Sequence, residues 1–228
     1  MSVRKLELVD SLHAGVDPFA FWQAKQEEVD LQGWRSQHPF LSSLIEELCP
    51  RTIVEVGVWK GTSVLTMAEK IQECSLDCAI IAVDTWRGSS EHWCQPENYR
   101  LMKVQNGLPR LYEAFMANVI AKSLQGYVVP LPVDSLTAYE ILKQKVIHPE
   151  LVHIDAGHGY QSVSRDLEMW SDLLSPGGSI IMDDYDWDDE NQTSNSWHDV
   201  ARAVNDFVNV NSSLLEFRHS NGKCVLSF

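Results

Sequence analysis

A strand-like run, a glycine turn and an amphipathic helix follow one another in the first third of the chain and constrain the fold more than any other stretch. Residues 53–58 read Ile-Val-Glu-Val-Gly-Val and are rich in β-branched side chains, as in a buried parallel strand. Gly57 and Gly61 then form the turn, and apolar residues recur at helical spacing over residues 64–71. This order predicts one unit of a doubly wound α/β sheet, with a ligand approaching the backbone of the turn.

The acid within this strand, Glu55, indicates the class of ligand. A dinucleotide-binding turn has the spacing Gly-x-Gly-x-x-Gly and receives a diphosphate. Here the turn reads Glu55-x-Gly57-x-x-x-Gly61. A carboxylate in this position would repel a diphosphate, whereas it could hold an amino group directly or through water. The alternative is a tight strand–helix turn that binds no ligand.

Length, composition and charge limit the class of protein. The chain has 228 residues, of which 44% are hydrophobic and 22% are charged, enough for one domain with a full core plus a small extension. We expect an N-terminal helical extension over residues 1–50, which covers the ligand cleft, forms a dimer contact or packs on the sheet edge, and a ligand-binding domain over residues 51–228. The formal charge of −14 argues against nonspecific binding of nucleic acid or anionic membranes, but not of a small molecule.

Cysteine usage indicates a cytoplasmic protein. The five cysteines are odd in number and none belongs to a Cys-x-x-Cys motif, which favours reduced thiols. The pattern of a signal peptide and an apolar run long enough for a membrane span are both lacking. We therefore expect a cytoplasmic location, with a homodimer through the N-terminal helices as one possible arrangement.

Strands and helices are expected to alternate along most of the chain. The apolar patterns predict strands over residues 53–58, 79–84, 127–133, 151–155 and 179–182, and helices over 18–31, 40–48, 64–71, 110–121, 136–145, 163–174 and 200–208. An Asn-Gly pair at 221–222 predicts a hairpin of segments 214–217 and 224–228. Residues 85–109 are expected to form a long irregular loop over the substrate. The order predicts a doubly wound, mostly parallel seven-stranded α/β sheet with an antiparallel C-terminal hairpin and helices on both faces.

Acidic residues gather at the ends of the predicted strands. Because ligands of such sheets bind at the carboxyl ends of the parallel strands, this distribution marks the binding edge. Asp84, at the tip of the second strand, is placed to accept hydrogen bonds from both hydroxyls of a ribose, with the capping of a turn as the alternative. The acids at this edge are Glu55, Asp84, Asp134, Asp155, Asp183 and Asp184.

Asp155, Asp183 and Asp184 are expected to converge, because neighbouring parallel strands lie about 5 Å apart. Three clustered carboxylates repel one another unless they are protonated or bind a cation. An all-oxygen set selects Mg²⁺, Mn²⁺ or Ca²⁺ rather than zinc. The alternative is that Asp184 caps a turn and only one or two of these acids face the cleft.

His158 is the candidate general base. It follows the fourth predicted strand, close to the acids, and an imidazole can take a proton from a hydroxyl near neutral pH. The alternative is a structural histidine that bonds a backbone carbonyl. His153 alternates into the strand interior, and we expect it to be packed there.

Several motifs occur together and in order. They are Glu55-Val-Gly57-x-x-x-Gly61, Val83-Asp84-Thr85-Trp86-x-Gly88, His153-Ile-Asp155-x-x-His158-x-Tyr160, Leu174-Ser-Pro-Gly-Gly178 and Asp183-Asp184-Tyr185. The set resembles class I S-adenosylmethionine-dependent methyltransferases, in the small bacterial branch related to macrocin-type O-methyltransferases of sugars and natural products. The resemblance covers about residues 50–228.

The resemblance implies S-adenosylmethionine as methyl donor, a hydroxyl of a sugar or natural product as acceptor, and a divalent metal, magnesium by preference, on Asp155, Asp183 and Asp184. The predicted donor-binding residues are Glu55, Gly57, Gly61, Thr62, Ser63, Asp84, Thr85, Trp86, Asp134 and Ser135. Asp134 would meet the adenine amino group, although an acid at a helix N-terminus explains it equally well, with Ser135 as the helix cap.

The predicted catalytic residues are Asp155 and His158. Relatives in the macrocin group carry an acid, their proposed base, at the position of Gly157, so His158 is the candidate to replace it. Trp86, Trp93 and Tyr185 are expected to wall the site. The alternatives are N-methyl transfer, metal-independent O-methyl transfer, and a non-catalytic accessory role on the same fold.

Overall fold

Seven strands form one mixed sheet. The computed structural model describes residues 2–23, 28–34, 36–185, 196–213 and 215–228. The strands are β1 Thr52–Val56, β2 Ala79–Val83, β3 Val128–Leu131, β4 Leu151–Ile154, β5 Ser179–Met182, β6 Glu216–Ser220 and β7 Lys223–Ser227. Their order is β3-β2-β1-β4-β5-β7-β6, and β7 runs antiparallel to both of its neighbours while the other pairs are parallel. The predicted doubly wound seven-stranded sheet is confirmed.

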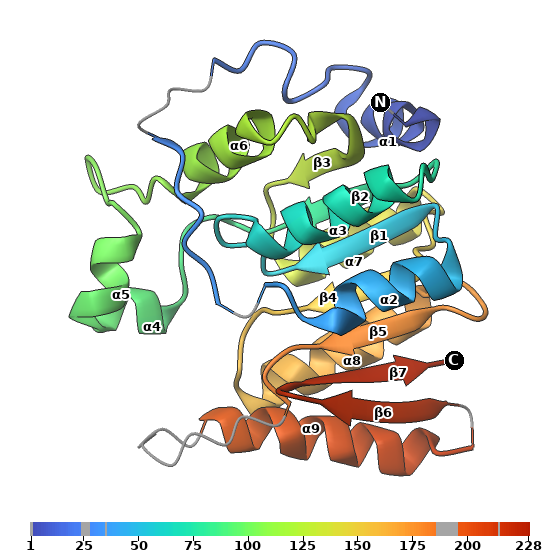
Figure 1. Ribbon diagram of the computed structural model, residues 1–228. Helices are drawn as coiled ribbons and strands as arrows, with labels where there is room; N and C mark the ends of the chain where they lie inside the picture. The colour runs from blue at the N-terminus through green and yellow to red at the C-terminus, as the bar shows by residue number, and fades with distance from the viewer. Residues whose placement is uncertain (1, 24–27, 35, 186–195, 214) are drawn as a thin grey trace.

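Helices cover both faces of the sheet (Figure 1). They are α1 Val3–His13, α2 Pro39–Leu48, α3 Thr62–Glu73, α4 Ser90–Cys94, α5 Pro96–Leu101, α6 Leu111–Ala121, α7 Ser135–Gln144, α8 Tyr160–Leu173 and α9 Ser196–Asn211. One apolar core contains residues of α1, α7, α8 and α9, and the other contains residues of α2, α3 and α6. In β1, Val54 and Val56 belong to the first core and Ile53 to the second, as strand alternation requires. Among the described residues, no helix is both long and apolar enough to cross a membrane.

The C-terminal hairpin brings new side chains to the carboxyl edge of the parallel strands. Asn221 and Gly222 have φ values of 46° and 86°, the positive values that a two-residue hairpin turn needs. After this turn β7 pairs with β5, with Cys224 opposite Met182. Because β7 is antiparallel to β5, the strand begins where β5 ends. The residue at its start, Lys223, therefore lies beside the acids that follow β5.

The first 34 residues differ from expectation. The helix predicted over residues 18–31 is wrong for the residues that the structure describes, 18–23 and 28–31, which contain no α-helix; residues 24–27 lie outside the described part. The Asp17 carboxylate accepts a hydrogen bond from the Phe19 N–H, which favours a turn there. The helix in this region is α1, whose buried residues are Lys5, Leu8 and Val9, too narrow an apolar stripe to stand out in the sequence.

Two further local expectations are corrected. The connection over residues 85–109 is not wholly irregular, because it contains the short helices α4 and α5, the second beginning at Pro96. The cap of α7 is Asp134 rather than Ser135. The Asp134 carboxylate accepts hydrogen bonds from the Thr137 backbone N–H and hydroxyl, which Ser135, one residue later, is not placed to do.

Candidate active site

The glycine turn after β1 touches the exit of β4. Gly57 has a φ of 88°, and a Cβ there would lie 2.0 Å from the carbonyl oxygen of Asp155. Gly61 has a φ of 85°, and a Cβ there would lie 2.6 Å from the Phe115 ring. Both positions thus require glycine for conformation and for space. The turn and Asp155 form one continuous edge at the point where the strand order reverses, between β1 and β4.

Asp84, at the end of β2, holds the glycine turn in place through hydrogen bonds. Its Oδ2 accepts hydrogen bonds from the backbone N–H groups of Val58, at 2.8 Å, and Trp59, at 2.9 Å, while Oδ1 accepts one from the Trp86 N–H at 2.7 Å. Burial raises the pKa of the Asp84 carboxyl, and these three N–H groups oppose the rise. A carboxylate has about four acceptor positions, so this conformation leaves one, enough for one of the two ribose hydroxyls expected there.

Glu55 lies inside the sheet rather than at an open surface. Its side chain is fully buried, and its Oε1 accepts a hydrogen bond from the hydroxyl of Ser63 on α3. Its Oε2 has no hydrogen-bond partner among the described residues. That oxygen is the acceptor that an amino group or a water molecule would use. Two of the predicted donor-binding side chains, Glu55 and Ser63, are thus in contact.

The other predicted donor-binding residues have varied surroundings. Thr62 begins α3, and Thr85 is exposed after β2. The ring of Trp86 is buried against Tyr112 and Phe115, and its indole N–H donates to the Trp59 carbonyl, so this ring is part of the core rather than a wall of the site. The expected role of Trp86 as a wall is therefore corrected.

Beyond Asp134, which caps α7, the side chain of Ser135 also serves the fold. The Ser135 hydroxyl donates to Asp166 and accepts a hydrogen bond from the Trp170 indole, both on α8. Because these contacts occupy the Ser135 side chain, its predicted donor-binding role is left to its backbone.

Tyr185, a predicted wall of the site, packs on Phe217, and its hydroxyl donates to Asn205.

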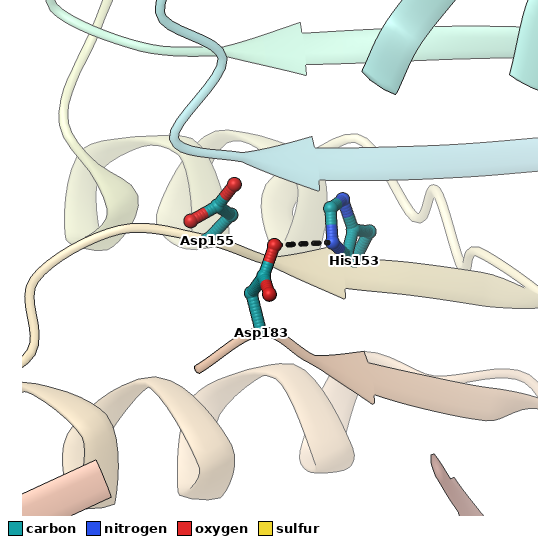
Figure 2. Close-up of side chains that lie close together, drawn as sticks. All are labelled: His153, Asp155 and Asp183. Atoms are coloured by element: carbon teal, nitrogen blue, oxygen red, sulfur yellow. Dashed lines mark ion pairs between the residues drawn. The ribbon is translucent and has the colours of Figure 1, made fainter. Parts of the chain in front are cut away.

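The acids after β4 and β5 form two groups that share Asp155. In each group, one ligand atom from every member lies within 4.8 Å of the others. The inner group is His153, Asp155 and Asp183 (Figure 2), and the outer group is Asp155, His158 and Asp184. The three aspartates were expected to form one set; instead, each group pairs two of them with a histidine.

Acidic and basic side chains alternate in and around the inner group, in the order Glu55, His153, Asp183 and Lys223. His153 is fully buried, with Nδ1 3.7 Å from Glu55 Oε1 and Nε2 3.8 Å from Asp183 Oδ2. Burial and the Lys223 charge lower the pKa of His153, but Asp183 and Glu55 prevail and raise it to about 9. Burial would raise the pKa of Asp183, yet His153 and Lys223 hold it well below its usual range. His153 was expected to be packed in the sheet, and this is confirmed.

The outer group is more open. His158 Nε2 lies 3.1 Å from Asp184 Oδ2, and Nδ1 lies 3.7 Å from Glu91 on α4. Burial alone would lower the pKa of His158, but the Asp184 carboxylate outweighs burial, so the pKa lies above its ordinary value. The Asp155 carboxylate makes no hydrogen bond or ion pair with any described residue. Burial and the neighbouring Asp183 charge raise its pKa well above the usual range, although the charges of Lys223 and His153 oppose the rise.

A segment of the N-terminal region, residues 28–34, crosses the glycine turn; we call it the strap (Figure 1). Lys60 of the turn is 1% exposed and its ammonium group donates to Asp30 Oδ2 at 2.9 Å and Gln32 Oε1 at 3.3 Å. The Trp59 indole also donates to Gln32. Asn118 on α6 bonds the backbone of Asp30 and the carbonyl of Lys60. The N-terminal region therefore packs on the turn, a contact that the sequence did not reveal.

The strap should loosen when Asp30 is replaced by alanine. Burial raises the pKa of Asp30, but hydrogen bonds from Lys103 and Lys60 lower it to about 2. Its stabilising contribution, on the order of 2 kcal/mol, is therefore present above about pH 4 and lost as the pH falls through about 2. We expect the Asp30→Ala variant at pH 7 to show about ten-fold faster amide hydrogen exchange in residues 28–34. The exposed Asp10→Ala serves as control, and equal exchange in both variants would contradict the role of Asp30.

Comparison with known proteins identifies the family. The model of a methyltransferase domain matches residues 54–185, more than half of the chain. The chain belongs to this family. Its fold is the Rossmann-like fold of class I S-adenosylmethionine-dependent methyltransferases. The match begins in β1 and ends just after the Asp183-Asp184 pair, so it spans every strand end of the candidate site.

Solved structures share the fold at low sequence identity. The O-methyltransferase TomG from Streptomyces achromogenes, involved in tomaymycin synthesis and solved with S-adenosylmethionine, aligns with a TM-score of 0.60 at 14% identity over 87% of this chain and 82% of its own. The O-methyltransferase NovP aligns with a TM-score of 0.58 at 17% identity over 98% of this chain and 97% of its own. An O-methyltransferase from Bacillus cereus, solved with S-adenosylhomocysteine, gives 0.57 at 14% identity over 97% and 94%.

One curated relative is much longer than this methyltransferase. The uncharacterized protein y4gI of Sinorhizobium fredii is 27% identical over 153 residues, which are 66% of this chain but 15% of that protein. The chain therefore spans about a seventh of the length of that relative.

Sequence reasoning missed the strap and Lys223. Lys223 was hidden because a lysine after an Asn-Gly turn is ordinarily exposed. The signal that could have found it is the direction of the hairpin, since an antiparallel β7 beside β5 must begin next to the acids that follow β5. No comparable local signal marks the strap.

Proposed function

We propose that this methyltransferase transfers the methyl group of S-adenosylmethionine to a hydroxyl of a small molecule, a sugar or another natural product. The observation that carries the proposal is the juxtaposition of the glycine turn with the Asp155 carboxylate, which has no partner among the described residues, and the Asp184–His158 pair. A donor on the turn would lie beside groups that can hold and deprotonate a hydroxyl. The printed names of TomG and NovP, both O-methyltransferases, and the role of TomG in tomaymycin synthesis support the same reading.

The reaction needs little covalent participation by the protein. The acceptor oxygen attacks the methyl carbon, the carbon–sulfur bond breaks, and S-adenosylhomocysteine leaves with the electron pair of that bond. Holding the oxygen, carbon and sulfur in line supplies much of the rate. His158, oriented by Asp184, takes the hydroxyl proton. The Asp155 carboxylate stabilises positive charge at this edge of the sheet.

A divalent cation fits part of the predicted metal set. The carboxylates of Asp155 and its neighbour Asp184 are oxygen donors of the kind that Mg²⁺ and Mn²⁺ prefer. Such a cation would favour the alkoxide form of the acceptor. Asp183 fits less well, because the Lys223 ammonium group already bonds its Oδ2.

The direct test is a methyl-transfer assay with labelled S-adenosylmethionine and a panel of sugars and polyhydroxylated natural products. We expect a labelled O-methyl ether, with the rate reduced by EDTA and restored by Mg²⁺. Label on nitrogen in a panel of amines would favour N-methyl transfer instead. An EDTA-insensitive O-methylation would favour the metal-independent reaction.

Replacing Asp155 by alanine should separate chemistry from donor binding. We expect turnover of the acceptor found in the panel to fall by at least about 100-fold, because the carboxylate at the reacting edge is lost. The affinity for S-adenosylhomocysteine, measured by calorimetric titration, should change by less than about three-fold. Glu168→Ala, an exposed acid on α8, is the control. Activity that survives Asp155→Ala would contradict the proposed centre.

A further inference from the structure

We propose that Lys223 is the built-in cation of the inner group: its ammonium group holds Asp183 in the place of a metal ion, so that Asp183 is not a metal ligand. The proposal rests on the proposed function only for the position of the reaction centre. It differs from the expectation that Asp155, Asp183 and Asp184 together bind one metal ion, and it assigns a function to a residue that the expected site did not include.

Lys223 and Asp183 are both shielded from water. The Lys223 side chain is 0% exposed, and Asp183 is 6% exposed. The ammonium group donates to Asp183 Oδ2, and it lies 3.4 Å from His153 Nε2. Burying an ammonium group without a paired carboxylate is strongly unfavourable, so burial keeps Lys223 and Asp183 in contact.

The hairpin explains why a lysine occupies this place. β7 is buried along its first four residues, Lys223 to Leu226. The backbone N–H of Tyr185 donates to the Gly222 carbonyl at 2.9 Å, which fixes the turn against the segment after β5. The start of β7 is thereby held beside Asp183, and the Lys223 side chain extends into the sheet edge rather than into solvent.

A metal ion on Asp183 would have to share it with this ammonium group. The other oxygen, Oδ1, accepts the Asp184 backbone N–H at 2.9 Å, so both oxygens of Asp183 already have donors. A divalent cation within bonding distance of the same carboxylate would be repelled by the nearby ammonium charge. The Asp155 carboxylate bonds no ammonium group among the described residues, although the charge of Lys223 also acts on it. The two ends of the centre therefore differ: the inner end has its cation in the chain, and the outer end is open to an external one.

Direct titration of Mn²⁺ tests this assignment without an acceptor. Binding to the full chain is followed by calorimetry and by the electron paramagnetic resonance signal of free Mn²⁺. We expect Lys223→Met, which removes the charge but keeps much of the volume, to bind Mn²⁺ at least about ten-fold more tightly than the natural chain, because Asp183 becomes available. Lys223→Arg keeps the charge and should leave Mn²⁺ affinity unchanged.

Asparagine variants then show which acids are ligands. In the natural chain, Asp184→Asn should weaken Mn²⁺ binding by at least about ten-fold, whereas Asp183→Asn should change it by less than about three-fold. In the Lys223→Met background, Asp183→Asn should abolish the gain. Equal Mn²⁺ affinity in Lys223→Met and the natural chain would overturn the proposal, as would loss of binding by an Asp183→Asn chain that circular dichroism shows to be folded.

The double variant serves if Lys223→Met does not fold because Asp183, without the ammonium group, is repelled by the neighbouring carboxylates. Lys223→Met with Asp183→Asn removes both buried charges and is the variant of choice for folding. If Asp183 is not a ligand, this double variant binds Mn²⁺ as the natural chain does; a loss of binding overturns the proposal. Titration of S-adenosylhomocysteine is run in parallel, because failure of donor binding would contradict the proposed function while leaving the Mn²⁺ result to decide on Lys223.

Discussion

Gly57→Ala is expected to destabilise the protein by about 2–5 kcal/mol and to remove donor binding. An alanine at a φ of 88° costs about 1–2 kcal/mol, and forcing a methyl group into a packed position costs about 1–3 kcal/mol more. Here the new Cβ would lie 2.0 Å from the carbonyl oxygen of Asp155 and 2.5 Å from its carbonyl carbon. The obstacle is backbone, which has no rotamer to adopt, so either the turn or the exit of β4 must move.

Thermal unfolding and calorimetric titration measure the two parts of this prediction. The melting temperature should fall by about 5–15 °C, in line with the size of the chain. Any folded fraction should fail to bind S-adenosylhomocysteine, because a displaced turn no longer presents its backbone to the donor. Gly159→Ala is the matched control: it has a φ of −74°, and a Cβ there meets nothing within 4 Å. A Gly57→Ala protein as stable as Gly159→Ala would show that the close approach of turn and strand is wrong.

Asp84→Ala is expected to lower the affinity for S-adenosylhomocysteine by at least about 100-fold. The variant removes the remaining acceptor for a ribose hydroxyl, and it leaves the N–H groups of Val58, Trp59 and Trp86 without their partner. Trp59 and Trp86 also have positive φ values, 54° and 51°, which a bulky residue adopts only when its surroundings hold it there. Loss of the carboxylate therefore releases the turn as well as a ligand contact.

Asp77→Ala separates this effect from a general loss of negative charge. Asp77 precedes β2 at the opposite end of the same strand, where it bonds Arg4 and Arg51 at the surface. Its replacement should leave donor affinity within about three-fold of the natural value. Asp84→Ala must also be shown to be folded by circular dichroism before its affinity is interpreted. Micromolar binding by a folded Asp84→Ala chain would remove Asp84 from the donor site.

In the proposed function, the candidate site has two halves. The glycine turn and Asp84 form the proposed donor half, and both follow strands that lie beside each other in the sheet. The acids after β4 and β5 form the proposed acceptor half. Gly57 joins the two halves, because it packs so closely on the Asp155 carbonyl that a side chain at this position would collide with it.

Local sequence patterns were enough to predict the sheet, the position of the glycine turn and the edge at which the acids gather. These features are local: β-branched apolar runs predict buried strands, Gly57 and Gly61 predict the turn, and acids directly after strands must lie at the carboxyl edge. The helix predicted over residues 18–31 was wrong for the described residues 18–23 and 28–31, because its aromatic residues suggested an apolar face, whereas Asp17 initiates a turn. The short helix α1 was missed because so few of its residues are buried.

Which of the acids have partners among the described residues follows from contacts between distant segments. Lys223 and Asp183 are 40 residues apart, and Asp30 and Lys60 are 30 apart, so neither pair leaves a periodic signal in the sequence. Asp84 has its acceptor capacity largely filled by backbone, and Asp155 has no partner among the described residues. A carboxylate looks the same in any sequence; its charge, its partners and its remaining capacity depend on strand register and on which distant segment packs against it.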